Sequence, residues 1–344
     1  MVALANTNGA LLQIPQIGYS LYKTPAAQVP NGVRTALAAG VRHFDVATQY
    51  GTNAAVGKVL QDYVQHGAAS LVSPKEDNNS DIINATPLSL AAQVPRTAAK
   101  RKSELYVTHK VSNAEQALST QELQEAVLQQ QEMLVGKNGN KSNFLVMIHS
   151  PLTNREQRLR TYAALQDLQS KGKIAAVGVC HYGVAHLQEI IEYNLPPPAV
   201  VQLELSPFHR HVDVAAWAAA HGNIPLSCAA WSRLSSTAGP QDQWAAVGAL
   251  ASQKGVTKQQ VLIRWALQSG YLCVPRSSAQ FKVERAAIRE NAWPAIRTFT
   301  LTTEEMELLN SLDIQLPVGQ LGVTDGWEPT DIVDAKWDPT LLTT

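Results

Sequence analysis

The chain has 344 residues, and its 28 Lys and Arg balance its 28 Asp and Glu, so its formal net charge is zero. A neutral chain without a basic block lacks the electrostatic footprint of a nucleic-acid or membrane-surface binder, and no apolar run approaches the roughly 18 residues that a membrane helix needs. The N-terminus shows no basic segment followed by an apolar one, so we expect no signal peptide. Cys180, Cys228 and Cys273 lie far apart in apolar runs, which predicts reduced thiols in a cytoplasmic protein.

The first predicted element is a hairpin over residues 2–14. Asn8 and Gly9 stand between apolar flanks, and this pair is typical of a two-residue hairpin turn. Eight short apolar runs follow it, each succeeded by a stretch long enough for a helix. The runs lie near residues 18 and 45, end at Lys110 and His149, and then lie near residues 178, 202, 229 and 275.

Helical periodicity appears between these runs, most clearly over Thr120–Leu134, Gln157–Ser170 and Thr257–Gln268. The runs themselves are apolar on both faces, as strands of a buried parallel sheet are. Eight strand–helix units predict an α/β protein with a (β/α)8 TIM barrel, whose N-terminal end the hairpin closes. The competing fold is an open doubly wound sheet, but that fold predicts a G-x-G-x-x-G turn, which the chain lacks.

We expect one domain over residues 1–344 with two additions to the barrel. Residues 70–99 are rich in Ser, Asn, Pro and Ala without a clear period, which favours a surface insertion on the N-terminal face. Residues 314–344 form a predicted tail over the active-site end, and Trp327 within it is a candidate pocket lid.

Polar residues cluster where predicted strands end. Asp45, Lys110 and His149 lie at or near the C-terminal ends of three runs, and Tyr50 follows one of them. Each alone has an ordinary structural explanation, such as a hydrogen-bonded core carboxylate or a packed aromatic ring. Barrel enzymes keep their chemistry at this end, so the combination predicts an active site.

The motifs around these residues identify a known family. In chain order they are GVRHFDVATQYGTNAAVG (40–57), ELYVTHKV (104–111), FLVMIHSP (144–151), GKIAAVGVCH (172–181), VVQLE (200–204), CAAWSRLSS (228–236), VLIRW (261–265) and VPRS (274–277). This ordered set resembles the aldo-keto reductases and extends from Ile14 to about Asp313. The resemblance implies reduction of an aldehyde or ketone to an alcohol with hydride from NADPH.

The resemblance also implies the roles of the polar quartet. Tyr50 is the general acid, His149 orients the carbonyl oxygen, and Asp45 pairs with Lys110. Tyrosine is a weak acid with a pKa of about 10, so we expect the Lys110 ammonium to lower the pKa of Tyr50.

Cofactor contacts carry over from the family with several departures. Cys180 and His181 replace the usual Ser and Asn, Trp231 replaces a Tyr that stacks on nicotinamide, and Arg276 replaces the Lys that contacts the 2′-phosphate. Ala287 stands at the position where the family has an Arg. Arg285 or Arg289 could take over the role of that missing Arg. The implied cofactor-binding residues are Cys180, His181, Gln202, Trp231, Ser232, Leu234, Ser236, Arg276, Ser277, Glu290 and Asn291.

The family's pocket positions fall on Tyr22, Ser150 and Trp327. Ser150 replaces a bulky Trp of some members, which predicts an open wall and a preference for apolar or aromatic carbonyls. We expect a small carbonyl substrate as the partner, no nucleic acid and no membrane, and a monomer or weak dimer.

Alternative functions remain open at this point. A non-catalytic or slow NADP-binding regulatory relative would share these motifs. A barrel metal hydrolase could use His43, Asp45, His149 and His181 as ligands, although our prediction is that no metal is bound. A Schiff-base aldolase could act through Lys110.

Overall fold

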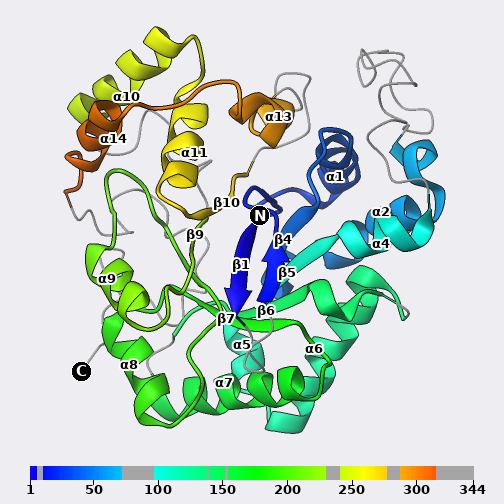
Figure 1. Cartoon of the computed structure of the whole chain (residues 1–344). Coiled ribbons are helices and arrows are strands. Elements are labelled where there is room, and N and C mark those ends of the chain that lie inside the picture. The colour runs from blue at the N-terminus through cyan, green and yellow to red at the C-terminus, as the bar shows by residue number, and fades with distance from the viewer. Residues whose placement is uncertain are drawn as a thin grey trace.

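The computed structural model describes residues 1–5, 11–71, 97–137, 139–151, 154–229, 241–276 and 287–314. Its central sheet has eight parallel strands in the order in which they occur along the chain (Figure 1). They are β3 (Tyr19–Ser20), β4 (His43–Ala47), β5 (Tyr106–Val111), β6 (Phe144–Ile148), β7 (Ala176–Cys180), β8 (Val201–Leu203), β9 (Leu226–Ala229) and β10 (Leu272–Val274).

The first and last strands meet and close the sheet. Ile17 forms a parallel bridge with Cys273, and the Gly18 amide donates to the Cys273 carbonyl oxygen at 2.8 Å. The Ser20 amide likewise donates to the Pro275 carbonyl oxygen at 3.0 Å. The fold is therefore a (β/α)8 barrel, and the prediction of fold and strands is confirmed.

Helices surround the barrel, and several follow the predicted periodicity. They are α1 (Val29–Ala38), α2 (Asn53–His66), α4 (Ala98–Glu104), α5 (Asn113–Gln116), α6 (Thr120–Val135), α7 (Arg155–Ser170), α8 (Val184–Glu192), α9 (Val212–Ala220), α10 (Gln241–Lys254), α11 (Lys258–Gln268), α13 (Trp293–Ile296) and α14 (Thr303–Asn310). Short 3-10 turns are η1 (Ala26–Gln28), η2 (Thr48–Tyr50), η3 (Gly67–Leu71) and η5 (Lys141–Asn143). Helix α6 begins where it does because Ser119 and Glu122 form a capping box.

Both faces of the strands are buried because side chains alternate across each strand. On β6, Phe144 and Val146 belong to the core between strands and helices, whereas Leu145 and Met147 belong to the core inside the barrel. Gly178 on β7 allows tight packing inside the barrel, since a Cβ there would lie 2.7 Å from the Val200 Cγ1 atom. The apolar character of both faces thus has a direct cause in the fold.

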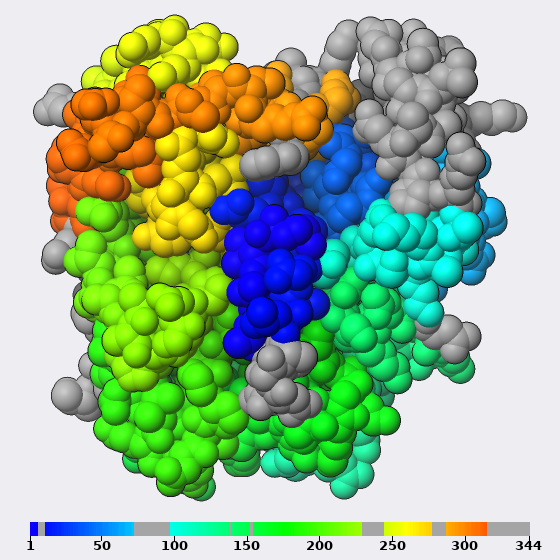
Figure 2. Space-filling model, viewed as in Figure 1, coloured from blue at the N-terminus to red at the C-terminus, as the bar shows by residue number. Residues whose placement is uncertain are grey.

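An antiparallel hairpin of β1 (Val2–Ala5) and β2 (Leu11–Ile14) precedes the barrel. Leu4 and Ile14 are buried in the inner core with Leu145 and Ala176, near the starts of β6 and β7. Figure 2 shows the hairpin in blue over the middle of one face of the molecule. The predicted hairpin is present and covers the N-terminal end of the barrel, while Asn8 and Gly9 lie outside the described residues.

Both additions to the barrel fall largely outside the described residues, which omit 72–96 and 315–344. The structure describes both ends of the proposed insertion: Ser70 is buried in η3, and α4 begins at Ala98. The insertion itself and the tail stay predictions. Among the helices that the structure describes, none is long and apolar enough to cross a membrane.

Candidate active site

Asp45 and Lys110 form an ion pair inside the barrel. They lie on the inward-facing rows of the adjacent strands β4 and β5, where Asp45 is opposite Thr108 and Lys110 is opposite Ala47. The Lys110 Nζ donates to Asp45 Oδ1, and the two side chains are only 2% and 1% exposed. Removing a charge from water costs free energy unless a partner compensates it, so each group of this pair depends on the other.

Further donors hold the carboxylate from other strands. Ser20 on β3 donates from its Oγ to Asp45 Oδ1 at 3.2 Å, and Gln202 on β8 donates from its Nε2 to Asp45 Oδ2 at 3.2 Å. The Gln202 Nε2 also donates to Ser227 Oγ on β9 at 3.4 Å. The sequence did not single out either serine, although Ser20 is paired with Asp45 in the sheet register.

Tyr50 lies above this pair at the end of η2. The Lys110 Nζ donates to its hydroxyl oxygen at 3.4 Å. Its ring centroid lies 5.3 Å from that of Tyr22 and 5.8 Å from that of His149, which it meets edge-on. Gly51 follows in the left-handed conformation at φ 65°, which a residue with a Cβ adopts only at a cost. The structure thus brings Asp45, Tyr50, Lys110 and His149 together, as predicted.

The electrostatics of Tyr50 differ from the prediction. Burial raises the pKa of Tyr50 well above its ordinary value, and the Asp45 carboxylate raises it further. The net shift is therefore opposite to the one predicted from the Lys110 ammonium, because that prediction left out burial first and the Asp45 carboxylate second. The phenol holds its proton throughout the neutral pH range.

His149 follows β6, and its amide donates to the Val111 carbonyl oxygen at 3.1 Å. Burial lowers its pKa well below the ordinary value, with Lys110 and then His109 adding to the shift. A neutral imidazole offers one N–H donor and one acceptor nitrogen. His149 can therefore hydrogen-bond a carbonyl oxygen beside Tyr50 without adding a positive charge.

Gln202, Cys180 and His181 lie next to the quartet at the ends of β8 and β7. Burial raises the pKa of Cys180 to about 12, so it is a thiol at neutral pH. It donates from its Sγ to Gln202 Oε1 at 3.8 Å, and a thiol is a weak donor. His181 is buried in the left-handed conformation, and burial lowers its pKa well below the ordinary value.

The positions of His43, Asp45, His149 and His181 do not support the metal-binding alternative. Among the described residues, no group of three or more His, Cys, Asp and Glu side chains is placed to hold a metal ion. The His43 Nε2 instead lies 2.8 Å from Thr108 Oγ1. Burial lowers the pKa of His43 to about 4.

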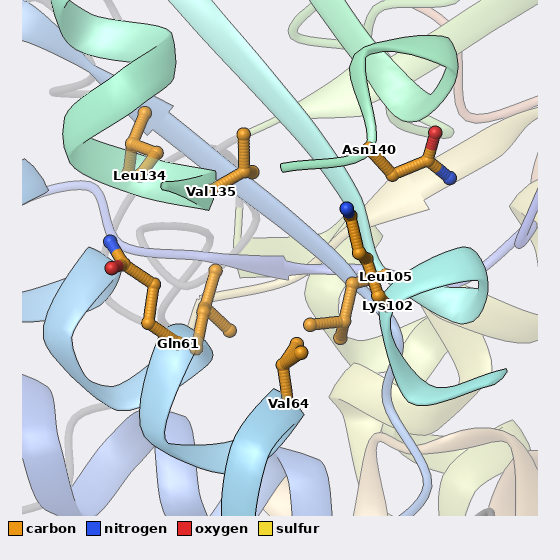
Figure 3. Close-up of a pocket in the computed structure, with 8 residues that line it drawn as sticks. Gln61, Val64, Lys102, Leu105, Leu134, Val135 and Asn140 are labelled. Carbon is orange, nitrogen blue, oxygen red and sulfur yellow. The ribbon is translucent and has the colours of Figure 1, made fainter. Parts of the chain in front are cut away.

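A small pocket lies away from this site, between α2, α4 and α6 (Figure 3). Its volume is about 20 Å³, and its lining includes Val64, Leu105 and Leu134, with Lys102 and Asn140 at its edge. A single water molecule needs about 10–15 Å³ of such volume, so this pocket does not compete as a ligand site.

A sequence model of the aldo/keto reductase family matches residues 16–314. The chain belongs to the aldo/keto reductase family. It is 26% identical over 300 residues to a putative methylglyoxal reductase DkgA of Salmonella typhi, which covers 87% of this chain and 90% of that protein. An aldo-keto reductase of Mycobacterium sp. strain KMS is 27% identical over 313 residues, covering 91% of this chain and 93% of that protein.

Solved structures share the fold of this aldo/keto reductase. The apo form of Gox0644 matches with a TM-score of 0.70 at 22% identity, over 100% of this chain and 99% of that one. MGS-M4, an aldo-keto reductase from a Medee basin deep-sea metagenome library, matches at 0.68 and 23% identity over 91% and 95%. Family membership confirms the resemblance: the chain is an oxidoreductase of carbonyl compounds, and such enzymes typically use a nicotinamide cofactor.

The other cofactor positions of this aldo/keto reductase are described unevenly. Arg276 donates from a terminal guanidinium nitrogen to the Lys23 carbonyl oxygen at 2.7 Å, next to β3. Asn291 is buried, and the Glu290 carbonyl oxygen accepts from Gln260 Nε2 at 3.1 Å. The remaining candidates lie outside the described residues: Trp231, Ser232, Leu234, Ser236, Ser277 and Trp327.

The two described substrate positions flank the quartet. Tyr22 is buried against the ring of Tyr50. Ser150, next to His149, is also buried, and its Oγ donates to Asn113 Oδ1 at 2.7 Å. The hydroxyl proton of Ser150 is therefore already engaged in a hydrogen bond. On this side of the pocket, a substrate meets a small side chain that can accept a hydrogen bond but not donate one.

Proposed function

We propose that this aldo/keto reductase reduces the carbonyl group of an aldehyde or ketone to an alcohol by hydride transfer from NADPH, with Tyr50 as general acid. The observation that carries the proposal is the contact of the Tyr50 hydroxyl with Lys110 at 3.4 Å, beside the ring of His149. A proton donor, a cation and a neutral hydrogen-bond donor thus surround one point at the mouth of the barrel.

The residues at the ends of β7, β8 and β10 suit a nicotinamide cofactor. The Gln202 Oε1 accepts only the weak Cys180 thiol among the hydrogen bonds described for it, which leaves it able to accept from a carboxamide N–H. Arg276 keeps the positive charge that a 2′-phosphate needs, and a guanidinium can bind phosphate through two nitrogens. When bound, NADPH supplies the hydride.

The protein's own groups handle the proton. As the carbonyl carbon is reduced, its oxygen gains negative charge and takes the proton of the Tyr50 hydroxyl. The resulting phenolate lies beside the Lys110 ammonium, which stabilises it, and solvent returns the proton. His149 donates to the same carbonyl oxygen and orients it. Because the pKa of Tyr50 is raised, its hydroxyl carries the proton at the start of each catalytic cycle. The proton leaves only when the carbonyl oxygen of the substrate becomes strongly basic.

The substrate class follows from the surroundings of Tyr50. Tyr22 supplies an aromatic face, and Ser150 supplies a small wall without a free proton. We therefore expect apolar or aromatic aldehydes and ketones to be reduced better than acidic or phosphorylated ones. Methylglyoxal belongs in the same panel, because relatives of this chain are named for its reduction.

The test is NADPH consumption by the purified protein with that panel of carbonyl compounds. Reduction of uncharged aldehydes is expected, and turnover of only acidic or phosphorylated compounds would contradict the substrate proposal. NADPH binding without any turnover would support the non-catalytic relative instead. Fluorescence titration with NADPH and NADH tests the role of Arg276, and tighter binding of NADH would overturn the choice of cofactor.

A further inference from the structure

The single-turn helix α5 contacts the loops that carry the proposed catalytic residues. It follows β5 and Lys110 directly, and it packs against α6 and α7 (Figure 1). We infer that α5 is a positioning bracket, in which Glu115 holds Thr48 and thereby sets where the Tyr50 hydroxyl lies relative to Lys110. This inference rests on the proposed function, since it concerns the geometry of the same proton donor.

The contact between the two loops is a hydrogen bond at the base of η2. Thr48 is the first residue of η2 and Tyr50 is the last, so one 3-10 turn joins the two. The Thr48 Oγ1 donates to Glu115 Oε1 at 3.0 Å. The His109 Nε2 lies 3.4 Å from the same Thr48 oxygen, and burial lowers the pKa of His109 to about 3, so this imidazole is neutral.

Glu115 is itself anchored by its second carboxylate oxygen. The Ser112 amide and the Ser112 hydroxyl both donate to Glu115 Oε2, at 2.7 and 2.8 Å. Ser112 lies two residues after Lys110, so the carboxylate bridges the chain that carries Lys110 to the chain that carries Tyr50. Each oxygen of Glu115 thus faces a different loop of the active site.

The other side of α5 holds the loop that carries His149. The Ser150 hydroxyl donates to Asn113 Oδ1 at 2.7 Å, and Gln116 Nε2 donates to the Ser150 carbonyl oxygen at 3.1 Å. One helical turn therefore contacts the loops of Tyr50 and His149 and directly follows the strand of Lys110. A shift of α5 would change the separations among the three groups together.

Helix capping alone does not explain the buried position of the Glu115 carboxylate. The next helix, α6, begins with the same capping box, in which Ser119 donates to Glu122 Oε2 from its amide at 3.0 Å and from its hydroxyl at 2.6 Å. Glu122 is exposed, whereas Glu115 is buried at 9% exposure. Burying a carboxylate costs free energy unless hydrogen bonds compensate it, and Glu115 accepts the Thr48 hydroxyl in addition to its bonds within the cap.

The experiment compares Thr48→Val, which removes the donor at nearly constant volume, with Thr48→Ser, which keeps it. Thr48→Val should lower kcat about tenfold, part of the roughly hundredfold loss that a 1 Å misplacement can cause. The KM for NADPH should stay unchanged, because the hydrogen bonds described for the Thr48 side chain go to His109 and Glu115 and to no proposed cofactor-binding residue. Thr48→Ser should restore kcat. Glu115→Ala should lower kcat similarly, whereas the matched capping variant Glu122→Ala should lower stability without lowering kcat.

A second background shows whether Thr48 acts through Tyr50. In Tyr50→Phe, the further change Thr48→Val should not reduce the residual rate any more, because the group being positioned is gone. An equal tenfold loss in both backgrounds would overturn the inference. So would a kcat loss in Glu122→Ala as large as that in Glu115→Ala.

Hydrogen exchange gives a readout that does not depend on activity. The Gly51 amide donates to the Thr48 carbonyl oxygen at 3.1 Å, so its exchange reports on η2. Thr48→Val and Glu115→Ala should each speed exchange in residues 48–51, and Glu122→Ala should not. If the wild-type protein reduced no carbonyl compound, the proposed function would fail, and unchanged exchange in residues 48–51 would separately overturn the bracket.

Discussion

The two ends of the barrel interior differ in chemistry although the same strands build both. At the N-terminal end, Leu4 and Ile14 of the hairpin belong to one apolar cluster with Leu145 and Ala176. The buried polar side chains there include His43, whose imidazole lies 2.8 Å from Thr108 Oγ1 and carries no charge at neutral pH. At the C-terminal end, inward positions hold the buried Asp45–Lys110 ion pair and its hydrogen-bond donors.

Along individual strands such as β6 and β7, the inward-facing side chains change from apolar at the N-terminal end to polar at the C-terminal end. On β6, inward positions run from Leu145 through Met147 to His149 just beyond the strand, and on β7 they run from Ala176 to Cys180. The apolar end contributes stability through burial, and the polar end places charges where burial is costly. The difference indicates that one end supports the fold and the other end carries the chemistry, which the following variants test.

Lys110→Met is expected to have the largest effect. It removes the cation beside the Tyr50 hydroxyl and leaves Asp45 buried without its counter-ion. Activity should fall by about 10²-fold or more, and the free energy of unfolding should fall by about 3–5 kcal/mol. Steady-state kinetics and urea unfolding measure the two effects. The double variant Asp45→Asn/Lys110→Met should recover part of the stability and none of the activity; a fully active Lys110→Met protein would refute the assignment.

Leu145→Ala tests the opposite end. The side chain is 1% exposed, so its truncation leaves a cavity under the hairpin and should lower the free energy of unfolding by about 2–5 kcal/mol. Since Leu145 lies far along β6 from His149, kcat and KM of the folded protein should not change. A loss of kcat without a loss of stability would show that the two ends are not separate in function.

The buried histidines predict a pH dependence of stability. Burial lowers the pKa of His43 to about 4, whereas an unfolded chain has a histidine pKa of about 6.5. Between these values the unfolded state binds a proton that the native state does not, so the free energy of unfolding falls as the pH drops from about 6.5 towards 4. Thermal unfolding between pH 7 and 4.5 measures this slope. His43→Gln should reduce this slope by the contribution of one histidine, because His109, His149 and His181 also have lowered pKa values. An unchanged slope would contradict the shift of His43.

Cys180→Ser is expected to have the smallest effect. The hydroxyl donates to Gln202 Oε1 more strongly than a thiol, and one net hydrogen bond contributes about 1 kcal/mol. The dissociation constant of NADPH should therefore change by less than about tenfold. Because its raised pKa keeps Cys180 a thiol, iodoacetamide at pH 8 should not alkylate it in the native protein. Rapid alkylation would show that this thiol is neither buried nor neutral.

The fold could be predicted because the strands of a buried parallel sheet appear in the sequence as short apolar runs, and β6 and β7 are such runs throughout. The meeting of Asp45 with Lys110 also followed from position, since adjacent parallel strands bring their C-terminal ends together. Ser20 and Ser227 could not be found in this way, because a serine in a strand is common and its partner depends on the register of the closed barrel.

The pKa of Tyr50 was predicted in the wrong direction for a related reason. Sequence motifs placed an ammonium beside the phenol, but they carried no information on how much water the barrel excludes. Burial, and after it the Asp45 carboxylate, raises the pKa of Tyr50. The link from Glu115 to Thr48 was equally hidden, since these residues are 67 positions apart and meet only through the arrangement of two loops.

The most direct test of the account is single-turnover hydride transfer in Tyr50→Phe, with the dissociation constant of NADPH measured on the same protein. The substitution removes one hydroxyl and keeps the ring that packs on Tyr22 and His149. We predict that the rate constant for transfer falls by about 10²- to 10⁴-fold, the usual contribution of a general acid, while NADPH binding is unchanged. A Tyr50→Phe protein that transfers hydride near the wild-type rate would contradict the assignment of Tyr50 as the proton donor.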